Sequence, residues 1–401
     1  MQYFFDQTPE SLAALCHELS LPRYAPAQLL EWVYRRGVAD FDEMTDISCA
    51  NRASLAERLT ILRGSQVAHQ VASDGTQKLL IAWPGPHAGD DADPALVLLA
   101  ERSQRETECV MIPDEKRRTA CVSSQVGCPV GCAFCASGIG GLEGNLTRGQ
   151  IVEQVFRLTR AISNSSLTTP PPSGREGAGG WVTRASVEKH STHPLTPSPG
   201  GRGNNERISH VVFMGMGEPL ANFAAVTGAV RTLNARWGFG ISARRITIST
   251  VGLPEAIRKL VNFDIPVTLA LSLHAPNDEL RRRLIPWANY TTIDALIDAC
   301  DDYFQKTGRE ITLEYILLRN VNDRPEHAKQ LAMIAKRLRS NVNLIRYNEV
   351  RGLPFERPAT EDVRRFQEIL RERGVNAHIR RSRGRDIAAA CGQLRHERNA
   401  T

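Results

Sequence analysis

The 401-residue sequence lacks long apolar runs, since no stretch approaches the roughly 18 consecutive apolar residues that a membrane-spanning helix needs. Its first ten residues, MQYFFDQTPE, also lack the positively charged flank and the apolar segment of a signal peptide. These two absences exclude helical membrane proteins and secreted proteins. We therefore expect a soluble, cytoplasmic protein with no membrane partner.

A strong excess of one charge is also missing. There are 50 Lys and Arg residues against 44 Asp and Glu residues, so the formal net charge is only +6. A mildly basic chain of this kind is compatible with a polyanionic partner. Hydrophobic residues make up 42% of the sequence, which is enough for a sizeable core and argues against wholesale disorder. At roughly 100 to 200 residues per domain, the length indicates two or three domains.

The nine cysteines do not form the even set that is typical of a disulfide framework in a small secreted protein. Cysteines that cluster in a reducing compartment more often bind metal or take part in chemistry. Cys16 lies on an apolar helical stripe and is predicted to be a small core residue. The sequence around Cys49, Cys109 and Cys300 contains no motif for metal binding or catalysis, so we predict the same packing role for them.

The N-terminal part, residues 1–66, is predicted to be a small helical domain. Thr8 and Pro9 form a helix start, and a second helix is expected to follow Pro26 and to end at Gly37. Residues 67–113 are predicted to form a β-rich connector, in which Asp74 and Gly75 are typical of a hairpin turn. Residues 86–94 are expected to form a polar loop.

Residues 114–391 alternate between apolar, β-branched runs and helical stretches such as 150–161 and 293–304. Repeated βα units predict parallel strands, either wrapped into a barrel or opened into a sheet. The chemistry of such folds gathers at the C-terminal ends of the strands. The predicted strands cover residues 119–124, 208–213, 245–249, 267–272, 311–317, 342–347 and 375–379.

One segment interrupts the βα alternation. Residues 163–207 contain three consecutive prolines, two Gly-Gly pairs and few large apolar residues. This composition cannot form a packed core, so we predict a disordered insertion without a catalytic function. Residues 392–401 are predicted to form a C-terminal tail.

Three cysteines with Cx3Cx2C spacing follow the first predicted strand of the βα array: Cys128, Cys132 and Cys135. Three thiolates from one short loop can hold three irons of a 4Fe-4S cluster and leave the fourth iron open to a non-protein ligand. A tetrahedral structural zinc would need a fourth Cys or His, and no His lies within the next 40 residues. The spacing therefore favours a cluster over zinc.

This cysteine motif, with an aromatic residue before its last cysteine, resembles the radical S-adenosylmethionine (SAM) superfamily. Further motifs are SSQVGC before the cluster, MGMGEPL at 214–220, ITISTVG at 246–252, LSLHAPND at 271–278, DIAAACGQL at 386–394 and FDEMTDI at 41–47. Together and in this order they resemble the RlmN/Cfr family of RNA adenosine methyltransferases. The resemblance implies a partial (βα)6-type barrel with a small N-terminal helical, RNA-binding accessory domain. It also implies one 4Fe-4S cluster and SAM as cofactors.

The resemblance places the SAM contacts at the C-terminal ends of strands. A glycine there lets a ligand approach the backbone, and a carboxylate can receive the SAM ammonium group. Taken singly, a Gly-Glu pair or a strand-end serine is more typical of a turn or a cap, and a single histidine is equally typical of a structural residue. The implied positions are Gly217, Glu218, Ser249, Ser272, Leu273, His274 and Asn348.

The resemblance also implies three catalytic residues. One SAM methylates the thiolate of Cys391, and a second SAM supplies the radical that removes a hydrogen from this S-methyl group. The resulting carbon radical adds to adenine, and Glu108 takes the ring proton. Cys121 then attacks the sulfur of Cys391, which releases the methylated base and leaves a transient disulfide. For Glu108 a plain surface carboxylate is the alternative, with Glu106 as a neighbouring candidate.

The implied partners are 23S rRNA, tRNA and a flavodoxin-type reductant, and the implied state is a monomer. An arginine-rich run before Cys391, with Arg371, Arg373, Arg380, Arg381, Arg383 and Arg385, is interpreted as a phosphate-binding surface rather than an ordinary solvated face, and Arg281 to Arg283 form a second basic segment. We expect methylation of adenosine C2. Two alternatives remain: methylation of C8, as in the Cfr branch, and a non-catalytic iron–sulfur protein that binds RNA.

Overall fold

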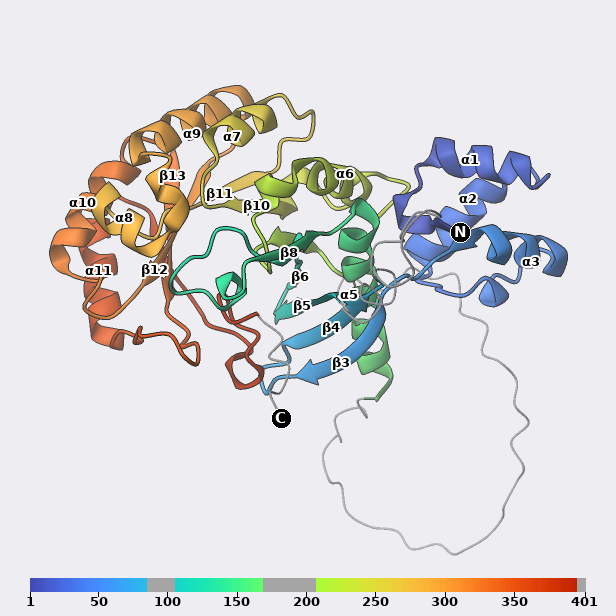
Figure 1. Cartoon of the computed structure of the whole chain (residues 1–401), viewed down its shortest axis with the longest axis horizontal. Helices are drawn as coiled ribbons and strands as arrows, with labels where there is room; N and C mark the ends of the chain where they lie inside the picture. The colour runs from blue at the N-terminus through green and yellow to red at the C-terminus, as the bar shows by residue number, and fades with distance from the viewer. Residues whose placement is uncertain (85–104, 169–206, 395–401) are drawn as a thin grey trace, which may run out of the picture.

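The computed structural model describes residues 1–84, 105–168 and 207–394 of the chain (Figure 1). The expected polar loop at 86–94, most of the expected insertion at 163–207 and most of the expected tail at 392–401 lie outside these residues. Within the described part of the chain, no helix is both long enough and apolar enough to cross a membrane.

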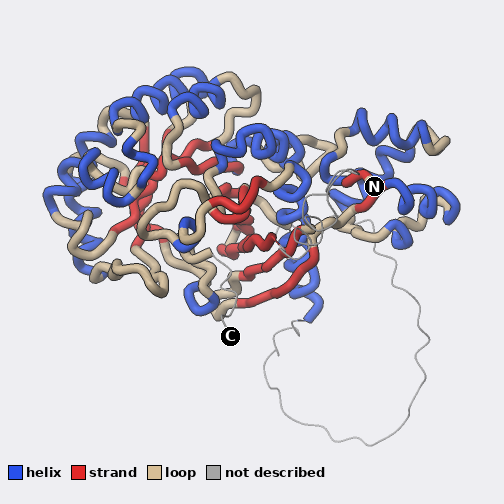
Figure 2. The backbone as a smooth tube through the Cα atoms, in the orientation of Figure 1, coloured by secondary structure: helices blue, strands red, loops and turns tan. Residues whose placement is uncertain are grey.

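A single curved sheet of ten strands forms the centre of the molecule (Figure 2). Parallel pairing joins seven neighbouring strands of this sheet, which are β6, β9, β10, β11, β12, β13 and β14. Antiparallel pairing then adds β5, β4 and β3 beyond β6. The sheet has two edges, β3 and β14, so it is an open, partial barrel, and the predicted fold class is confirmed. In spatial order the strands are β14 (Ala377–Arg380), β13 (Ser340–Arg346), β12 (Ile311–Leu317), β11 (Thr268–Ser272), β10 (Ile246–Thr250), β9 (His210–Phe213), β6 (Arg117–Cys121), β5 (Arg105–Asp114), β4 (Gln77–Trp83) and β3 (Ser65–Val71).

Helices cover the outer face of the parallel part of the sheet (Figure 1). Strand β12 shows how the sequence separates the two faces. Leu313, Tyr315 and Leu317 pack into the main core, whereas Glu314 and Ile316 face the inner cavity. This alternation follows from the two-residue period of a strand. The helices are α5 (Arg148–Thr168), α6 (Phe223–Asn234), α7 (Pro254–Val261), α8 (Asp278–Leu284), α9 (Ile293–Thr307), α10 (Pro325–Ala335) and α11 (Thr360–Glu372).

Three local expectations differ from the structure. Helix α5 continues to Thr168, so the first residues of the expected insertion are helical. Strand β6 ends at Cys121 rather than at residue 124. The second N-terminal helix begins at Ala25, before Pro26, because a proline in the first turn of a helix loses no intrahelical hydrogen bond. The expected hairpin is confirmed, with Gly75 at φ +79° between β3 and β4.

The N-terminal unit packs against α5 and against the loop that follows α6. The ring centroids of Phe5 and Phe156 are 5.2 Å apart, and those of Tyr34 and Phe239 are 5.3 Å apart. This unit is therefore continuous with the main core. Its elements are β1 (Gln2–Tyr3), η1 (Phe4–Asp6), α1 (Pro9–Glu18), α2 (Ala25–Leu30), the π-helical turn η2 (Glu31–Arg35), η3 (Phe41–Glu43), α3 (Cys49–Arg58) and β2 (Leu59–Thr60).

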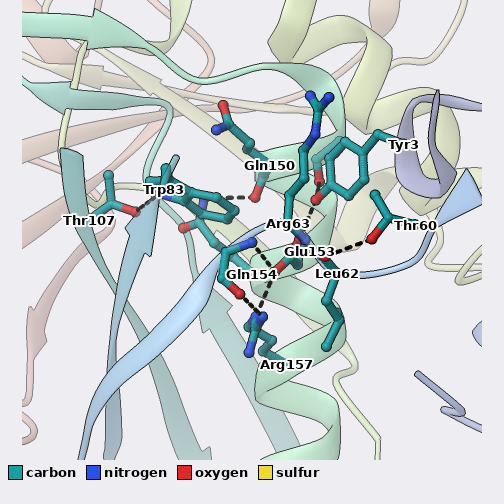
Figure 3. A network of polar contacts seen from close by, with 12 residues as sticks. Tyr3, Thr60, Leu62, Arg63, Trp83, Thr107, Gln150, Glu153, Gln154 and Arg157 are labelled. Atoms are coloured by element: carbon teal, nitrogen blue, oxygen red, sulfur yellow. Dashed lines mark hydrogen bonds and ion pairs between the residues drawn. The ribbon is translucent and has the colours of Figure 1, made fainter. Parts of the chain in front are cut away.

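A buried carboxylate on α5 joins the N-terminal unit to the barrel (Figure 3). Glu153 is fully buried and accepts hydrogen bonds from the backbone N–H groups of Arg63, at 2.8 Å, and Gly64, at 3.1 Å. It also accepts a hydrogen bond from the hydroxyl group of Tyr3 and pairs with the Nε of Arg157 at 2.7 Å. One side chain thus satisfies donors from both ends of the N-terminal unit.

We expect Glu153→Gln to lower the free energy of unfolding by about 2 to 4 kcal/mol, because an amide cannot accept all four donors and leaves Arg157 without its buried partner. Urea denaturation followed by tryptophan fluorescence measures this change. Glu57→Gln, on the exposed side of α3, is the matched control and should have no effect. Equal stability of the two variants would contradict the structural role of Glu153.

Candidate active site

The three clustered cysteines lie in a loop that follows the short strand β7 (Gln125–Gly127). Gly127 has φ +72°, and a Cβ atom there would lie 2.1 Å from the carbonyl oxygen of Gly141, so only glycine fits this turn. The loop is held by a hydrogen bond from the N–H of Cys128 to Gly141 (2.9 Å) and by one from Ala133 to the carbonyl of Leu284 (2.9 Å). Figure 1 shows this loop on the side of β6 that faces α8.

The sulfur-bearing side chains of Cys128, Cys132 and Cys135 line one cavity of about 120 Å³, which we call the thiol cavity. Burial raises the pKa of all three thiols, that of Cys128 to about 12, and the neighbouring cysteines raise the pKa of Cys132 further. Three buried thiols side by side become thiolates only beside compensating cations, and bound iron supplies these.

Within the described residues, no group of three His, Cys, Asp or Glu side chains is arranged to hold a single metal ion. A 4Fe-4S cluster does not require such convergence, because each thiolate binds a different iron of the cube. The three thiols therefore fit a cluster better than they fit a lone zinc ion.

Most of the predicted SAM contacts line the same thiol cavity: Gly217, Glu218, Ser249, Ser272 and His274. They come from the C-terminal ends of β9, β10 and β11, as expected for a parallel sheet. Two predicted contacts lie elsewhere. Leu273 is fully buried in the main core, and its backbone N–H binds the carbonyl of Glu314. Asn348 lines a neighbouring cavity.

Glu218 is placed in the thiol cavity by backbone groups. Its two carboxylate oxygens accept hydrogen bonds from the N–H groups of Leu220 (3.0 Å) and Val251 (2.9 Å). Burial nevertheless raises its pKa to about 7. A cation in the cavity would favour the carboxylate form, so Glu218 is suited to receive an ammonium group.

His274 has a defined proton position. Its Nδ1 accepts a hydrogen bond from the N–H of Ile316 at 3.1 Å, so the proton of the neutral ring lies on Nε2. Burial lowers its pKa to about 3, which keeps the ring neutral. The ring packs edge-on against Phe134, the aromatic residue of the cysteine motif, with a centroid distance of 5.1 Å. His274 therefore offers a single N–H donor near the cysteine loop.

Cys391 lies in the C-terminal loop, directly beside the cysteine loop. The N–H of Ala136 donates to the carbonyl of Gly392 at 2.8 Å, and the hydroxyl of Ser137 donates to the carbonyl of Leu394 at 2.7 Å. The amide of Asn348 donates to the carbonyl of Cys391 at 3.3 Å. These contacts bring a cysteine from the far end of the chain to the thiol cavity, which it also lines.

Cys391 also lines a second cavity of about 430 Å³, which we call the arginine cavity because Arg117, Arg380, Arg381 and Arg383 contribute to its wall. Cys391 is thus shared by two cavities of different chemistry. One is lined by thiols and by the ends of the barrel strands, and the other by cationic side chains.

Cys121, at the end of β6, is buried in a small cluster with Val110, Met216 and Ala389 of the C-terminal loop. Burial and, to a lesser extent, the neighbouring Cys391 raise its pKa to about 12, and the cation of Arg380 opposes both effects. All nine cysteines of the chain are free in the structure. The two predicted catalytic cysteines therefore lie within electrostatic reach of each other as separate thiols.

Glu108 is a buried residue of β5, with only 3% of its surface exposed, so the surface-carboxylate alternative is wrong. It lines a third cavity, of about 590 Å³, together with Lys78, Arg351, Arg385 and Gln393. Cys391 is not among the residues that line this cavity. The structure therefore brings Glu108 to the C-terminal loop but not into either cavity that Cys391 lines.

Sequence reasoning missed Lys78 and misinterpreted two arginines. Arg380 is partly buried and contacts the sulfur of Met214 at 3.5 Å, rather than standing on an exposed RNA-binding face. Arg281 is 1% exposed and donates to the carbonyl oxygens of Val251 and Leu273. Runs of arginine carry no signal that separates buried members from exposed ones, because that choice depends on the partners that the fold supplies.

Comparison with known proteins is consistent with this geometry. A family model described as the ribosomal RNA large subunit methyltransferase N-terminal domain matches residues 4–61, and a model of the radical SAM superfamily matches residues 200–332. A protein of Rhodopirellula baltica named probable dual-specificity RNA methyltransferase RlmN is 40% identical over 371 residues, which cover 92% of this chain and 84% of that protein.

A second relative, the dual-specificity RNA methyltransferase RlmN of Dichelobacter nodosus, is 37% identical over 97% of this chain and 93% of its own length. Among solved structures, a radical SAM methyltransferase from Sphaerobacter thermophilus superposes with a TM-score of 0.81. It shares 37% sequence identity, over 98% of this chain and 99% of that one.

Proposed function

The chain belongs to the RlmN family of radical SAM RNA methyltransferases, and from this premise we propose that it methylates C2 of one adenosine in 23S rRNA and of the adenosine 3′ to the anticodon in some tRNAs. The observation that carries the proposal is the position of Cys391, which lines both the thiol cavity and the arginine cavity. A residue in this position can receive a methyl group on one side and deliver it to a polyanion on the other.

The radical SAM superfamily implies a 4Fe-4S cluster and SAM as cofactors, which together supply a methyl group and a hydrogen-abstracting radical. We propose Cys128, Cys132 and Cys135 as the cluster ligands. For SAM we propose Gly217, Glu218, Ser249, Ser272, Leu273, His274 and Asn348. The carboxylate of Glu218 would pair with the ammonium group, and Nε2–H of His274 would donate to an acceptor on the ligand. Leu273 would act through its backbone and Asn348 by holding the loop of Cys391.

The RNA would approach from the arginine cavity, where the guanidinium groups of Arg117, Arg381 and Arg383 can contact phosphates. A base in a duplex cannot reach Cys391, so the target adenosine would be unstacked. The N-terminal unit, residues 1–66, would extend this RNA-binding surface. We further propose a cytoplasmic monomer that receives electrons from a flavodoxin-type protein.

The methyl group would travel on Cys391, which binds it first and transfers its carbon to the adenine ring. Glu108 would accept the ring proton. Cys121 would then attack the sulfur of Cys391, so that a Cys121–Cys391 disulfide forms as the bond from that sulfur to the methylene carbon breaks. The electron pair of the broken bond would pass to the released carbon, which would take up a proton to become the methyl group. The proximity of Cys121 to the loop of Cys391 supports this assignment.

We expect the iron-loaded protein, with SAM and a chemical reductant under anaerobic conditions, to convert adenosine in a 23S rRNA fragment to 2-methyladenosine. Mass spectrometry of the digested RNA against standards measures the product. Cys132→Ala, which lacks one cluster ligand, is the control and should give none. Formation of 8-methyladenosine would favour the Cfr-type alternative, and RNA binding without any methylation would favour the non-catalytic one.

A further inference from the structure

A buried lysine lies next to the proposed base. Lys78 is a residue of β4, a strand in which every residue is buried. Leu79, Ile81 and Trp83 of this strand face the main core, whereas Lys78 and Leu80 face the other side, toward the C-terminal loop. Burying an ammonium group is costly unless it has a partner, so a lysine at this position needs an explanation.

The partner of Lys78 is Glu108. Leu80 pairs directly with Glu108 in the antiparallel register of β4 and β5, so Lys78 is a diagonal neighbour of Glu108 on the same face of the sheet. The Nζ of Lys78 lies 2.8 Å from Oε1 of Glu108, and the two side chains are 10% and 4% exposed. The other oxygen, Oε2, is buried and has no hydrogen-bond partner. One oxygen of the carboxylate is therefore held, and the other is free to take a proton.

Lys78 also reaches the loop of Cys391. Its Nζ lies 3.5 Å from the carbonyl oxygen of Ala388, a residue with φ +49° three positions before Cys391. Two further hydrogen bonds join the β3–β4 hairpin to this loop. The N–H of Ser73 donates to Asp386 at 2.8 Å, and the N–H of Gly384 donates to Asp74 at 3.1 Å. The hairpin and Lys78 therefore bind the loop at three points.

We propose that Lys78 is a positioning residue for Glu108, which orients its carboxylate and couples it to the loop that carries Cys391. This inference rests on the proposed role of Glu108 as proton acceptor. Lys78 itself does not touch the substrate; it acts through Glu108. A neutral residue at this position would remove the cation that pairs with Oε1 of Glu108.

Several charged side chains lie around Glu108. Lys78 faces it from β4, Arg385 and Asp386 lie on η8 (Arg385–Ile387), and Glu349 and Arg351 lie on the loop after β13; all line the same cavity. Lys78 is the member that contacts Glu108 directly. Removing this cation leaves the buried carboxylate without the partner that holds its Oε1. Glu108 would then no longer be fixed in one orientation, so transfer of the ring proton to it should slow.

The experiment compares Lys78→Met, Lys78→Arg and Lys259→Met in single-turnover methylation of RNA, with Cys391 methylated beforehand. We expect Lys78→Met to slow formation of the methylated base roughly 10- to 100-fold. Lys78→Arg should recover most of this rate, since it keeps a cation that can pair with Oε1 of Glu108. Lys259→Met, on the exposed side of α7, should match the unaltered protein.

A double variant tests whether Lys78 acts through Glu108. In the Glu108→Gln background no buried carboxylate remains, so adding Lys78→Met should cause no further loss of rate. This pair also remains informative if Lys78→Met alone folds poorly, because the double variant leaves no unpaired anion. Additive losses would overturn the inference, as would an unchanged rate of methylation in Lys78→Met or a Lys78→Arg variant that is as slow as Lys78→Met.

Different results would refute the proposed function and the proposed role of Lys78. Methylation of Cys391 is read separately, from the mass of the proteolytic peptide that contains it. Unmethylated Cys391 in the unaltered protein would refute the proposed function itself, and full RNA methylation by Glu108→Gln would refute the proposed role of Glu108. Normal methylation of Cys391, a Glu108→Gln variant with strongly slowed RNA methylation and a Lys78→Met variant with an unchanged rate would refute only the role of Lys78.

Discussion

Replacing Cys391 with alanine is expected to abolish RNA methylation while leaving the iron content of the protein unchanged. Cys391 would carry the methyl group, and no other described cysteine lines both the thiol cavity and the arginine cavity. Its side chain is not one of the three thiols of the cysteine loop, so cluster binding should survive its removal. The fold should survive as well, because alanine already occupies three of the positions before it.

The measurement combines mass spectrometry of digested RNA with iron and sulfide analysis of the variant. Roughly four irons per chain are expected in both proteins, on the chemistry of a 4Fe-4S cluster. Cys49→Ala is a suitable control and should keep full activity, because Cys49 is exposed at the start of α3 and not packed in the core as predicted. Methylated adenosine produced by Cys391→Ala would refute the carrier mechanism.

Replacing Cys121 with alanine is expected to trap RNA covalently on the protein. Without the thiol of Cys121, the proposed nucleophile that displaces the sulfur of Cys391 is missing, so the adduct between Cys391 and the base should accumulate instead of turning over. The described environment supports this role, because Cys121 packs against Ala389, two residues before Cys391, and Arg380 counteracts the effect of burial on its pKa.

A labelled RNA that stays with the protein on a denaturing gel reports the adduct. Cys109→Ala is a matched control, because Cys109 is an equally buried cysteine on the adjacent strand β5, but it packs into the main core rather than toward the C-terminal loop. It should turn over normally and trap nothing. Free turnover by Cys121→Ala would remove its assigned role, and trapping by Cys109→Ala would point to an effect of packing.

The βα order was predictable because each strand is a short apolar run with its own local signature. Strand β12 occupies the predicted residues 311–317, and helix α9 begins at the predicted residue 293. Boundaries that depend on tertiary packing were less predictable. Helix α5 runs beyond residue 163, and its described side chains pack on the N-terminal unit through Phe156 and Glu153.

The burial and the partners of charged residues could not be predicted from the sequence. The arginine run before Cys391 is uniform in sequence, yet Arg381 is exposed at a cavity wall while Arg380 points inward to Met214. In the same way, Glu108 and Lys78 are 30 positions apart on different strands, and nothing local distinguishes them from surface residues. Their pairing depends on the register between β4 and β5.

The sequence by itself determined the three-thiol loop, because Cys128, Cys132 and Cys135 lie within one short turn and their spacing alone brings them together. It also determined the order of the βα units and, through its motifs, the family. Only the tertiary structure decided which distant residues meet: Cys391 with the cysteine loop, Cys121 with Ala389, and Lys78 with both Glu108 and Ala388. These contacts are non-local, since they depend on strand order, register and the path of the C-terminal loop, and no short stretch of sequence encodes them.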